Sequence, residues 1–302
     1  MSRERAAADR HHRLAVMGAY GVIYLVWGST FLAIRLGVRD LPPLLFASGR
    51  SLLAAGLLLV VAIALRDRFP KTPREWCYMA LLGQLMITFS NGLNTIAMKH
   101  IPSNETALLT STLALWMAGL GALGPRGHPL TVRGTLGLFL GLAGVGLLLW
   151  PQAAQEPGHL GWQLLVIIGG LSWSVGTVLY RDAQLPVGPL AFNATIMWFG
   201  ACGMLVAGVA RGEWPQWHWE ARGVLAMVYL AVFGSALAYT AYSWLIKHSP
   251  TDRVATFAYV NPAIATLLGW AVLGEALGPL QIGGTLVILL AVALVTLPSR
   301  IA

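Results

Sequence analysis

Arg50 is the one ionisable residue that lies clearly inside a long apolar stretch of the sequence, about six residues from the start of that stretch. At about 1.5 Å per residue of helix it would lie roughly 9 Å deep. A guanidinium can hold a carboxylate through two parallel hydrogen bonds, which makes Arg50 a candidate contact for an acidic or zwitterionic ligand. The alternative is a structural role in which Arg50 binds carbonyl groups at the ends of neighbouring helices.

Aromatic and amide side chains near the centres of other apolar stretches form a second set of candidates. Asn91 and Asn94 are three residues apart and would share a helix face, and Tyr239 and Tyr242 have the same spacing. Apolar cavities with a few polar groups to orient the ligand are typical of small-molecule sites. Ordinary helix packing is the alternative for each residue. The full set of candidate binding residues is Trp27, Arg50, Asn91, Asn94, Trp116, Trp173, Tyr239, Tyr242, Tyr259 and Asn261.

Pro262 follows Asn261 at the centre of the ninth apolar stretch. A proline removes one backbone donor and frees a carbonyl. Inside a membrane helix such a position lines a cavity or is repaired by neighbouring groups. The sequence therefore predicts a hinge or helix break at Pro262.

The composition places these residues in a membrane protein. Apolar residues make up 57% of the chain and charged residues 11%, against roughly 45–50% and about 25% in a soluble domain. An apolar run of about 20 residues spans a bilayer as a helix, and a helix satisfies its own backbone groups. We therefore expect an all-α integral membrane protein with ten transmembrane helices. These are expected at Leu14–Ile34, Leu44–Leu65, Trp76–Met98, Asn104–Leu123, Val132–Leu149, Leu160–Tyr180, Pro189–Ala210, Gly223–Ile246, Arg253–Val272 and Pro279–Leu297.

The sequence does not indicate covalent catalysis. No paired acids, His–metal cluster or Ser/His arrangement falls at membrane depth, and all seven histidines fall in predicted tails or loops. A phosphate-binding glycine loop followed by lysine is also absent. We therefore expect no catalytic residue, no metal site and no cofactor, and an integral membrane enzyme is a weak alternative.

The chain has a net charge of +8, and its lysines and arginines are distributed unevenly between the two expected sides of the membrane. Fourteen lysines and arginines fall on the side of the N-terminus and five on the other side. This positive-inside bias predicts that both termini are cytoplasmic. It also argues against a nucleic-acid partner, which would need a clustered basic module.

One corner of the chain occurs twice: "KHIPSNETALL" begins at Lys99 and returns as "KHSPTDRVATF" at Lys247. Trp27 and Trp173 recur with a similar offset of 146 residues. Because each half holds five expected helices, an odd number, the second copy would be inverted in the membrane. Inverted repeats are typical of secondary transporters, with a site near the midplane between them. The expected divisions are a basic cytoplasmic tail at 1–13, a first five-helix repeat at 14–150, a linker at 151–159, a second five-helix repeat at 160–298 and a tail at 299–302.

Several motifs resemble those of a known family. They are "WGSTF" in the first helix, "FASGRSLLAAGLLL" in the second and "LGEALGPLQIGGTLVILLAV" near the end. With the five-plus-five repeat, they resemble the drug/metabolite transporter superfamily, and its EamA branch most closely, from about Leu14 to Pro298. The resemblance implies a ten-helix fold in a bacterial inner membrane and export of amino acids or other small metabolites.

The sequence departs from the family pattern at one point. The family commonly carries Gly-Glu after the penultimate helix of each half. Gly274-Glu275 fits this pattern in the second half, whereas the first half reads "GPRGHP" from Gly124 and lacks the acid. A role shared by two symmetric glutamates is therefore in doubt.

We accordingly expect a secondary transporter that exports small metabolites through a midplane cavity. Amino acids are favoured, aromatic or other large ones slightly so, as in the aromatic amino acid exporters of this family. An importer, or a carrier of another small metabolite or drug, is the alternative. No acid or histidine lies in the middle of an expected helix, which favours facilitated flow over proton coupling. The expected partners are the substrate and membrane lipids; a monomer is favoured, although a glycine ridge in the fifth helix could serve a homodimer.

Overall fold

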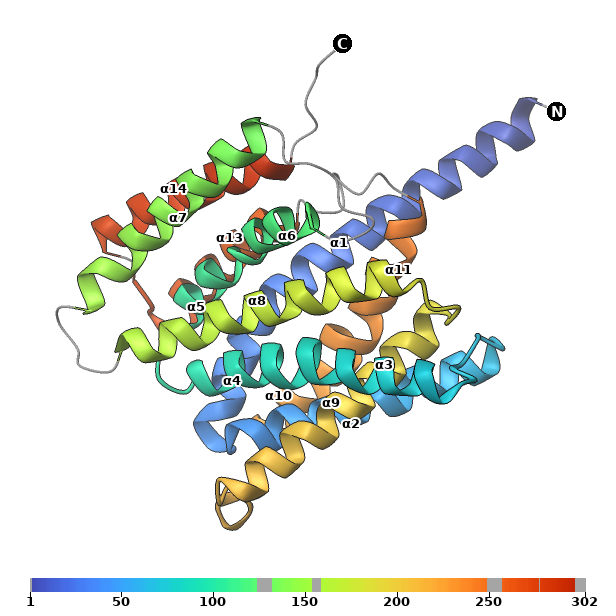
Figure 1. Ribbon diagram of the computed structural model, residues 1–302, viewed down its shortest axis with the longest axis horizontal. Coiled ribbons are helices and arrows are strands. Elements are labelled where there is room, and N and C mark those ends of the chain that lie inside the picture. The colour runs from blue at the N-terminus through green and yellow to red at the C-terminus, as the bar shows by residue number, and fades with distance from the viewer. Residues whose placement is uncertain (1, 124–131, 154–158, 249–256, 277, 297–302) are drawn as a thin grey trace.

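Figure 1 shows a computed structural model of the chain, which describes residues 2–123, 132–153, 159–248, 257–276 and 278–296. Every regular element within these ranges is a helix. Five helices are long and apolar enough to cross a bilayer, and shorter apolar helices accompany them. Leu25, Phe139 and Leu225 remain 65%, 69% and 70% exposed, as expected of side chains that face lipid rather than water. The predicted all-α membrane fold is confirmed.

The described helices form ten successive rods. Single α-helices make up seven of them: α1 (Ser2–Asp40), α2 (Pro43–Ala64), α7 (Val132–Ala153), α8 (His159–Ala183), α9 (Pro189–Ala210), α13 (Phe257–Leu273) and α14 (Pro279–Thr296). Composite rods make up the other three: α3 (Pro73–Gly83) with η1 (Gln84–Gly92) and α4 (Leu93–Ala97); α5 (Ser103–Thr110) with α6 (Leu113–Gly121); and α10 (Ala221–Tyr229) with η3 (Leu230–Leu237) and α11 (Ala238–His248). A short 3₁₀ turn, η2 (Trp214–Gln216), connects α9 to α10.

The helices α2 and α9 pack side by side, and each is capped by a carboxylate that follows the end of the other. Asp67, beyond α2, accepts hydrogen bonds from two first-turn N–H groups of α9, at 2.8 and 3.0 Å. Glu213, beyond α9, accepts two from the first turn of α2, at 2.9 and 3.0 Å. Carboxylates stabilise a helix N-terminus because they satisfy its free donors and complement its dipole. Gly188 leaves room for Asp67, since a Cβ there would lie 1.5 Å from Oδ1.

This reciprocal capping establishes that the repeats are inverted. The end of α2 lies at the start of α9, and the end of α9 lies at the start of α2. The two equivalent helices therefore run antiparallel. The doubled corner agrees: in Figure 1, α4 ends at the left of the molecule, just before Lys99, and α11, which carries Lys247, ends at the right. We call these two ends of the molecule the Lys99 side and the Lys247 side.

Packing between the repeats follows the same symmetry. The first helix of each repeat packs against the third and fourth rods of the other: α1 against α10, α11 and α13, and α8 against η1, α4 and α6. The pair α7 and α14 forms one flank and α2 with α9 the opposite flank, with α1 and α8 between them (Figure 1). Gly141 and Gly144 on α7 serve contacts within the chain, because a Cβ would lie 2.2 Å from Leu115 and 2.9 Å from Ile288 respectively.

The third and eighth rods each contain a π-helical segment at the equivalent position. η1 begins at Gln84 and η3 at Leu230, which are 146 residues apart, the offset of Trp27 and Trp173. π-helical segments are rare and are often found at functional sites. Their duplication marks the centre of both repeats as the region to search for a site.

The fourth rod is interrupted, which differs from the continuous helix expected at Asn104–Leu123. The hydroxyls of Ser111 and Thr112 donate to the carbonyls of Leu108 and Leu109, each at 2.6 Å. Such bonds from Ser and Thr to the preceding turn compete with regular helical bonding and often bend the helix. The regular helix is therefore interrupted between α5 and α6.

The helix α1 begins at Ser2, and its part that is apolar enough to span a membrane begins at Arg13, next to the expected start at Leu14. One further prediction needs correction. α13 runs through Pro262 without interruption, so the predicted break is wrong as a break. Pro262 is only five residues from the first residue of α13. The carbonyl that loses its hydrogen bond lies four residues before Pro262 and so belongs to the first turn of the helix. A hinge at Pro262 stays a prediction.

Candidate functional site

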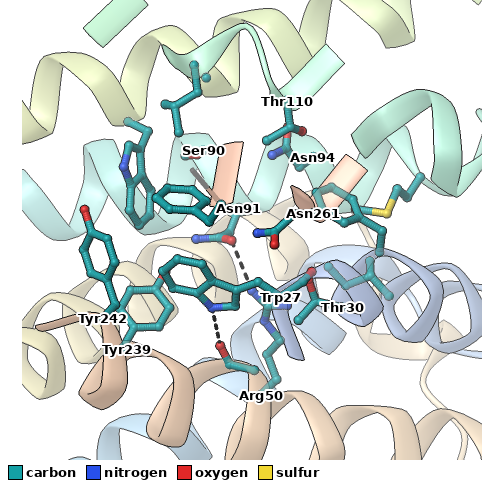
Figure 2. Close-up of a pocket in the computed structure, with 18 of the residues that line it drawn as sticks. Trp27, Thr30, Arg50, Ser90, Asn91, Asn94, Thr110, Tyr239, Tyr242 and Asn261 are labelled. Carbon is teal, nitrogen blue, oxygen red and sulfur yellow. Dashed lines mark hydrogen bonds between the residues drawn. The ribbon is translucent and has the colours of Figure 1, made fainter. Parts of the chain in front are cut away.

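A cavity lies between the two repeats, beside the two π-helical segments. Its volume is about 160 Å³, measured as the space open to the centres of water molecules. One water needs about 10–15 Å³ on this measure, so the cavity has room for a ligand of about ten non-hydrogen atoms. Eight of the candidate residues line it: Trp27, Arg50, Asn91, Asn94, Trp173, Tyr239, Tyr242 and Asn261 (Figure 2).

Arg50 reaches the cavity from α2 and is only 8% exposed. Its Nη2 donates to Asn91 Oδ1 at 3.1 Å, the dashed contact in Figure 2. Asn91 is oriented in turn by η1, because its Nδ2 donates at 3.2 Å to the carbonyl of Met86, five residues earlier. Arg50 Nε has no hydrogen-bond partner among the described residues, and Arg50 takes part in none of the ion pairs found between them. A buried cation without an anion is unfavourable, so the site suits a negatively charged ligand group.

Aromatic rings form one wall of the cavity. Trp27 Nε1 donates at 3.0 Å to the carbonyl oxygen of Gly234, inside η3 (Figure 2). The centroid of the Trp27 ring lies 5.6 Å from Tyr239, 5.3 Å from Tyr242 and 5.2 Å from Phe257. These are ordinary separations for tilted and edge-to-face aromatic pairs. The wall therefore offers a fixed apolar surface to a ligand.

Two amides leave acceptors unused around the cavity. The Oδ1 atoms of Asn94 and Asn261 are buried and have no hydrogen-bond partner among the described residues. Asn94 Oδ1 lies against α8, where a Cβ on Gly169 would be 3.0 Å away. Buried polar groups in proteins nearly always have a partner, including water or a ligand. Small rotations of these amides would present acceptors to a ligand in the cavity.

Two candidates do not take part in this arrangement. Trp116 lies about 100° around α6 from Met117, whose side chain lines the cavity, and Trp116 instead lines a separate apolar cavity of about 350 Å³. Leu138 and Val145 of α7 complete that second cavity. The side chain of Tyr259 lies outside the described residues, so its position is not assigned.

Other lining residues were absent from the sequence-based set. Thr30, Phe31 and Ile34 follow Trp27 at helical spacing on one face of α1, a signal that could have been used. Thr110 lines the cavity because α5 ends there, at the break before α6. The position of Gly234 depends on η3, and a π-helical segment has no recognisable sequence pattern.

A buried acidic group was also missed. Glu105, in the first turn of α5, is 1% exposed and accepts a hydrogen bond from Gln163 Nε2 on α8. His159 Nε2, at the start of α8, lies 3.2 Å from Glu105 Oε1. The expectation that all histidines fall in tails or loops is therefore wrong for His159. This cluster lies outside the cavity lining and ties α5 to α8 on the Lys99 side.

Comparison with known proteins agrees with this architecture. The pattern of the EamA-like transporter family matches twice, over residues 17–150 and 160–297. The chain is 35% identical over 286 residues to a protein of Escherichia coli K12 named "Uncharacterized inner membrane transporter YedA", covering 94% of this chain and 91% of the relative. It is 27% identical over 290 residues to the Bacillus subtilis "Uncharacterized transporter YvbV", covering 95% and 93%.

A solved crystal structure has the same fold. It superimposes with a TM-score of 0.68 at 20% sequence identity and covers 97% of this chain and 99% of its own. At this identity the likeness concerns the fold alone. The doubled family match, the inverted repeats and the similarity to named transporters over nearly the whole length agree with one another. This chain belongs to the EamA-like transporter family, whose members are membrane transporters of small molecules.

Proposed function

We propose that this protein exports amino acids across a bacterial inner membrane, with aromatic and other large ones preferred. The observation that carries the proposal is Arg50, a buried cation in the cavity with no ion-pair partner among the described residues. A substrate carboxylate would supply the missing anion. Its two oxygens match the planar guanidinium, and hydrogen bonds between charged groups are stronger than neutral ones.

The remaining lining supports a substrate with an apolar side chain. Trp27, Trp173 and Tyr242 provide aromatic surface, and Asn94 and Asn261 provide amide acceptors suited to an ammonium group. The described lining holds no Asp or Glu. Amino acids with an additional positive charge, such as lysine, should therefore bind poorly beside Arg50.

Alternating access would expose the cavity to one side at a time. The two caps at Asp67 and Glu213 fix both ends of the α2–α9 pair, so this pair is the proposed stationary part. The remaining helices of the two repeats would rock around it, as inverted repeats permit, with Pro262 as a proposed hinge. The positive-inside bias supports cytoplasmic termini, in which case the Lys99 side faces outward.

Flux through purified protein in liposomes tests this proposal. Labelled phenylalanine, leucine, alanine and lysine are loaded inside or outside the vesicles, with and without a pH gradient. We expect phenylalanine and leucine to move fastest and lysine slowest. Export is supported if vesicles of uniform orientation show a lower KM on the cytoplasmic face, whereas a lower KM on the opposite face would indicate an importer. No flux of any amino acid would refute the proposed substrate class.

A further inference from the structure

We propose that Glu275 is the latch that holds the cavity closed on the Lys99 side; this inference rests on the alternating-access function proposed above. Glu275 lies between α13 and α14, in the second repeat. Gly274, with φ +68°, turns the chain there, so that Glu275 N donates at 3.1 Å to the carbonyl of Gly269. This turn directs the carboxylate to the start of α5, in the first repeat.

The carboxylate supplies the N-terminal cap that α5 lacks in its own sequence. Pro102 occupies the cap position and provides no side-chain acceptor. Glu275 Oε1 accepts from Ser103 N at 2.9 Å, and Oε2 accepts from Ser103 Oγ at 2.7 Å and from Asn104 N at 3.1 Å. Three charge-assisted hydrogen bonds therefore join residues more than 170 positions apart, across the boundary between the repeats.

These bonds hold together α5 and the end of α13, and both helices contribute to the cavity lining. The helix α5 packs against α1 and α13, whereas no comparable contact joins α6 to α13 among the described residues. The fourth rod (α5 with α6) and the ninth rod (α13) thus meet at Glu275. Farther from Glu275 both rods line the cavity, where Thr110 is the last residue of α5. An opening on the Lys99 side must separate α5 from α13 and break all three bonds.

Arg35 strengthens the same closure. It lies near Glu275 and interacts with it electrostatically, and its Nη1 donates to the carbonyl of Met98. Met98 is at once the last residue before the doubled corner and part of the cavity lining. Arg35 therefore joins α1 to the residue after α4, close to the carboxylate that caps α5.

The latch differs from the two caps on the α2–α9 pair. Asp67 and Glu213 cap equivalent helices at opposite ends, so together they are compatible with only one arrangement of that pair. For Glu275 the equivalent position of the first repeat falls in "GPRGHP", which begins at Gly124 and carries no acid. The sequence therefore provides this carboxylate on one side of the membrane only. We infer that it biases the empty protein toward closure on the Lys99 side.

Sided labelling of a cysteine in the cavity tests the latch without any substrate. Thr110→Cys is introduced after Cys77→Ser and Cys202→Ser, and a membrane-impermeant maleimide is added to vesicles of each orientation. We expect Glu275→Gln to raise the labelling rate from the Lys99 side about tenfold, a shift of about 1.4 kcal/mol between the two states. Glu275→Asp, which keeps the charge, should restore part of the closure.

A matched control separates a latch from an ordinary helix cap. Glu213→Gln removes a cap of the same kind on the same side and should lower the melting temperature without changing the sidedness of labelling. The proposal is overturned if Glu275→Gln behaves like this control. If Glu275→Gln does not fold, Ser103→Ala removes one of the three bonds and must still raise labelling from the Lys99 side. Altered sidedness with no amino acid flux would leave the latch standing and refute only the substrate.

Discussion

Replacing Arg50 by methionine distinguishes a substrate contact from a structural arginine, because the two roles predict opposite effects on stability. Among the residues that the structure describes, the Arg50 side chain hydrogen-bonds only to Asn91, whose side chain is only partly buried. Water in the cavity can replace that donor at little cost. Removing a buried charge that has no ion-pair partner in the described part of the chain also relieves an unfavourable desolvation. We therefore expect the melting temperature of the empty protein to be unchanged or higher.

The effect on binding should be large and confined to the carboxylate. Hydrogen bonds to charged groups contribute about 1.5–3 kcal/mol each, which corresponds to roughly a 10- to 150-fold weaker Kd. Wild-type protein should bind phenylalanine at least tenfold more tightly than phenylalaninamide, which lacks the carboxylate. The Arg50→Met variant should bind the two equally. Arg50→Lys keeps the charge but loses the planar guanidinium. Its preference for phenylalanine over phenylalaninamide should lie between those of the wild type and Arg50→Met.

Equilibrium binding of both ligands to purified wild type and variants, with thermal unfolding in parallel, provides the measurement. A structural arginine would give the reverse pattern, in which Arg50→Met melts earlier and the discrimination between phenylalanine and its amide is kept. That result would refute the carboxylate role of Arg50. Membrane insertion, checked by the yield of folded protein, controls for expression.

Three further outcomes follow from the same geometry. Trp27→Ala should lower phenylalanine flux at least tenfold with normal insertion, because it removes the centre of the aromatic wall. Trp116→Ala should leave the Kd for phenylalanine unchanged, because Trp116 lines the separate cavity. Gly141→Leu should destabilise the protein by about 1–3 kcal/mol through overpacking against the neighbouring helix, read from thermal unfolding. Asp67→Asn and Glu213→Gln should each cost about 1 kcal/mol and act additively, since they cap helices at opposite ends of one pair; a non-additive double variant would contradict independent caps.

The scaffold could be predicted from the sequence because the bilayer imposes long apolar helices and because the chain repeats itself. The helix expected at Pro189–Ala210 has these same ends in the structure. The offset between Trp27 and Trp173 also relates the two π-helical segments, although neither segment could be read from residue types. Arg50 and the amides Asn91, Asn94 and Asn261 line the cavity because charged and polar residues inside membrane helices seldom face lipid.

The errors come from local backbone geometry and from contacts between separate helices. Ser111 and Thr112 interrupt the fourth rod through hydroxyl bonds to the preceding turn, and beyond this interruption Met117, rather than Trp116, lines the cavity. The burial of Glu105, in the first turn of α5, was not predicted from the sequence. It arises because Gln163, on another rod, packs against Glu105 and donates a hydrogen bond to it. Such contacts depend on which helices meet, and a single helix does not contain that information.

Some structural features occur in both repeats, whereas each charged residue of the site occurs in only one of them. This difference suggests how the transport cycle is driven. Caps and π-helical segments occur in both repeats, so these features alone do not distinguish one end of the molecule from the other. The charged groups of the site are single: the position equivalent to Arg50 at the same offset is Ile196, which is fully buried. Glu275 is single as well. A substrate that neutralises Arg50 can then favour one closed end over the other only through its differential contacts with the two states. The asymmetric residues, rather than the repeated ones, are therefore where substitutions should change transport without unfolding the protein.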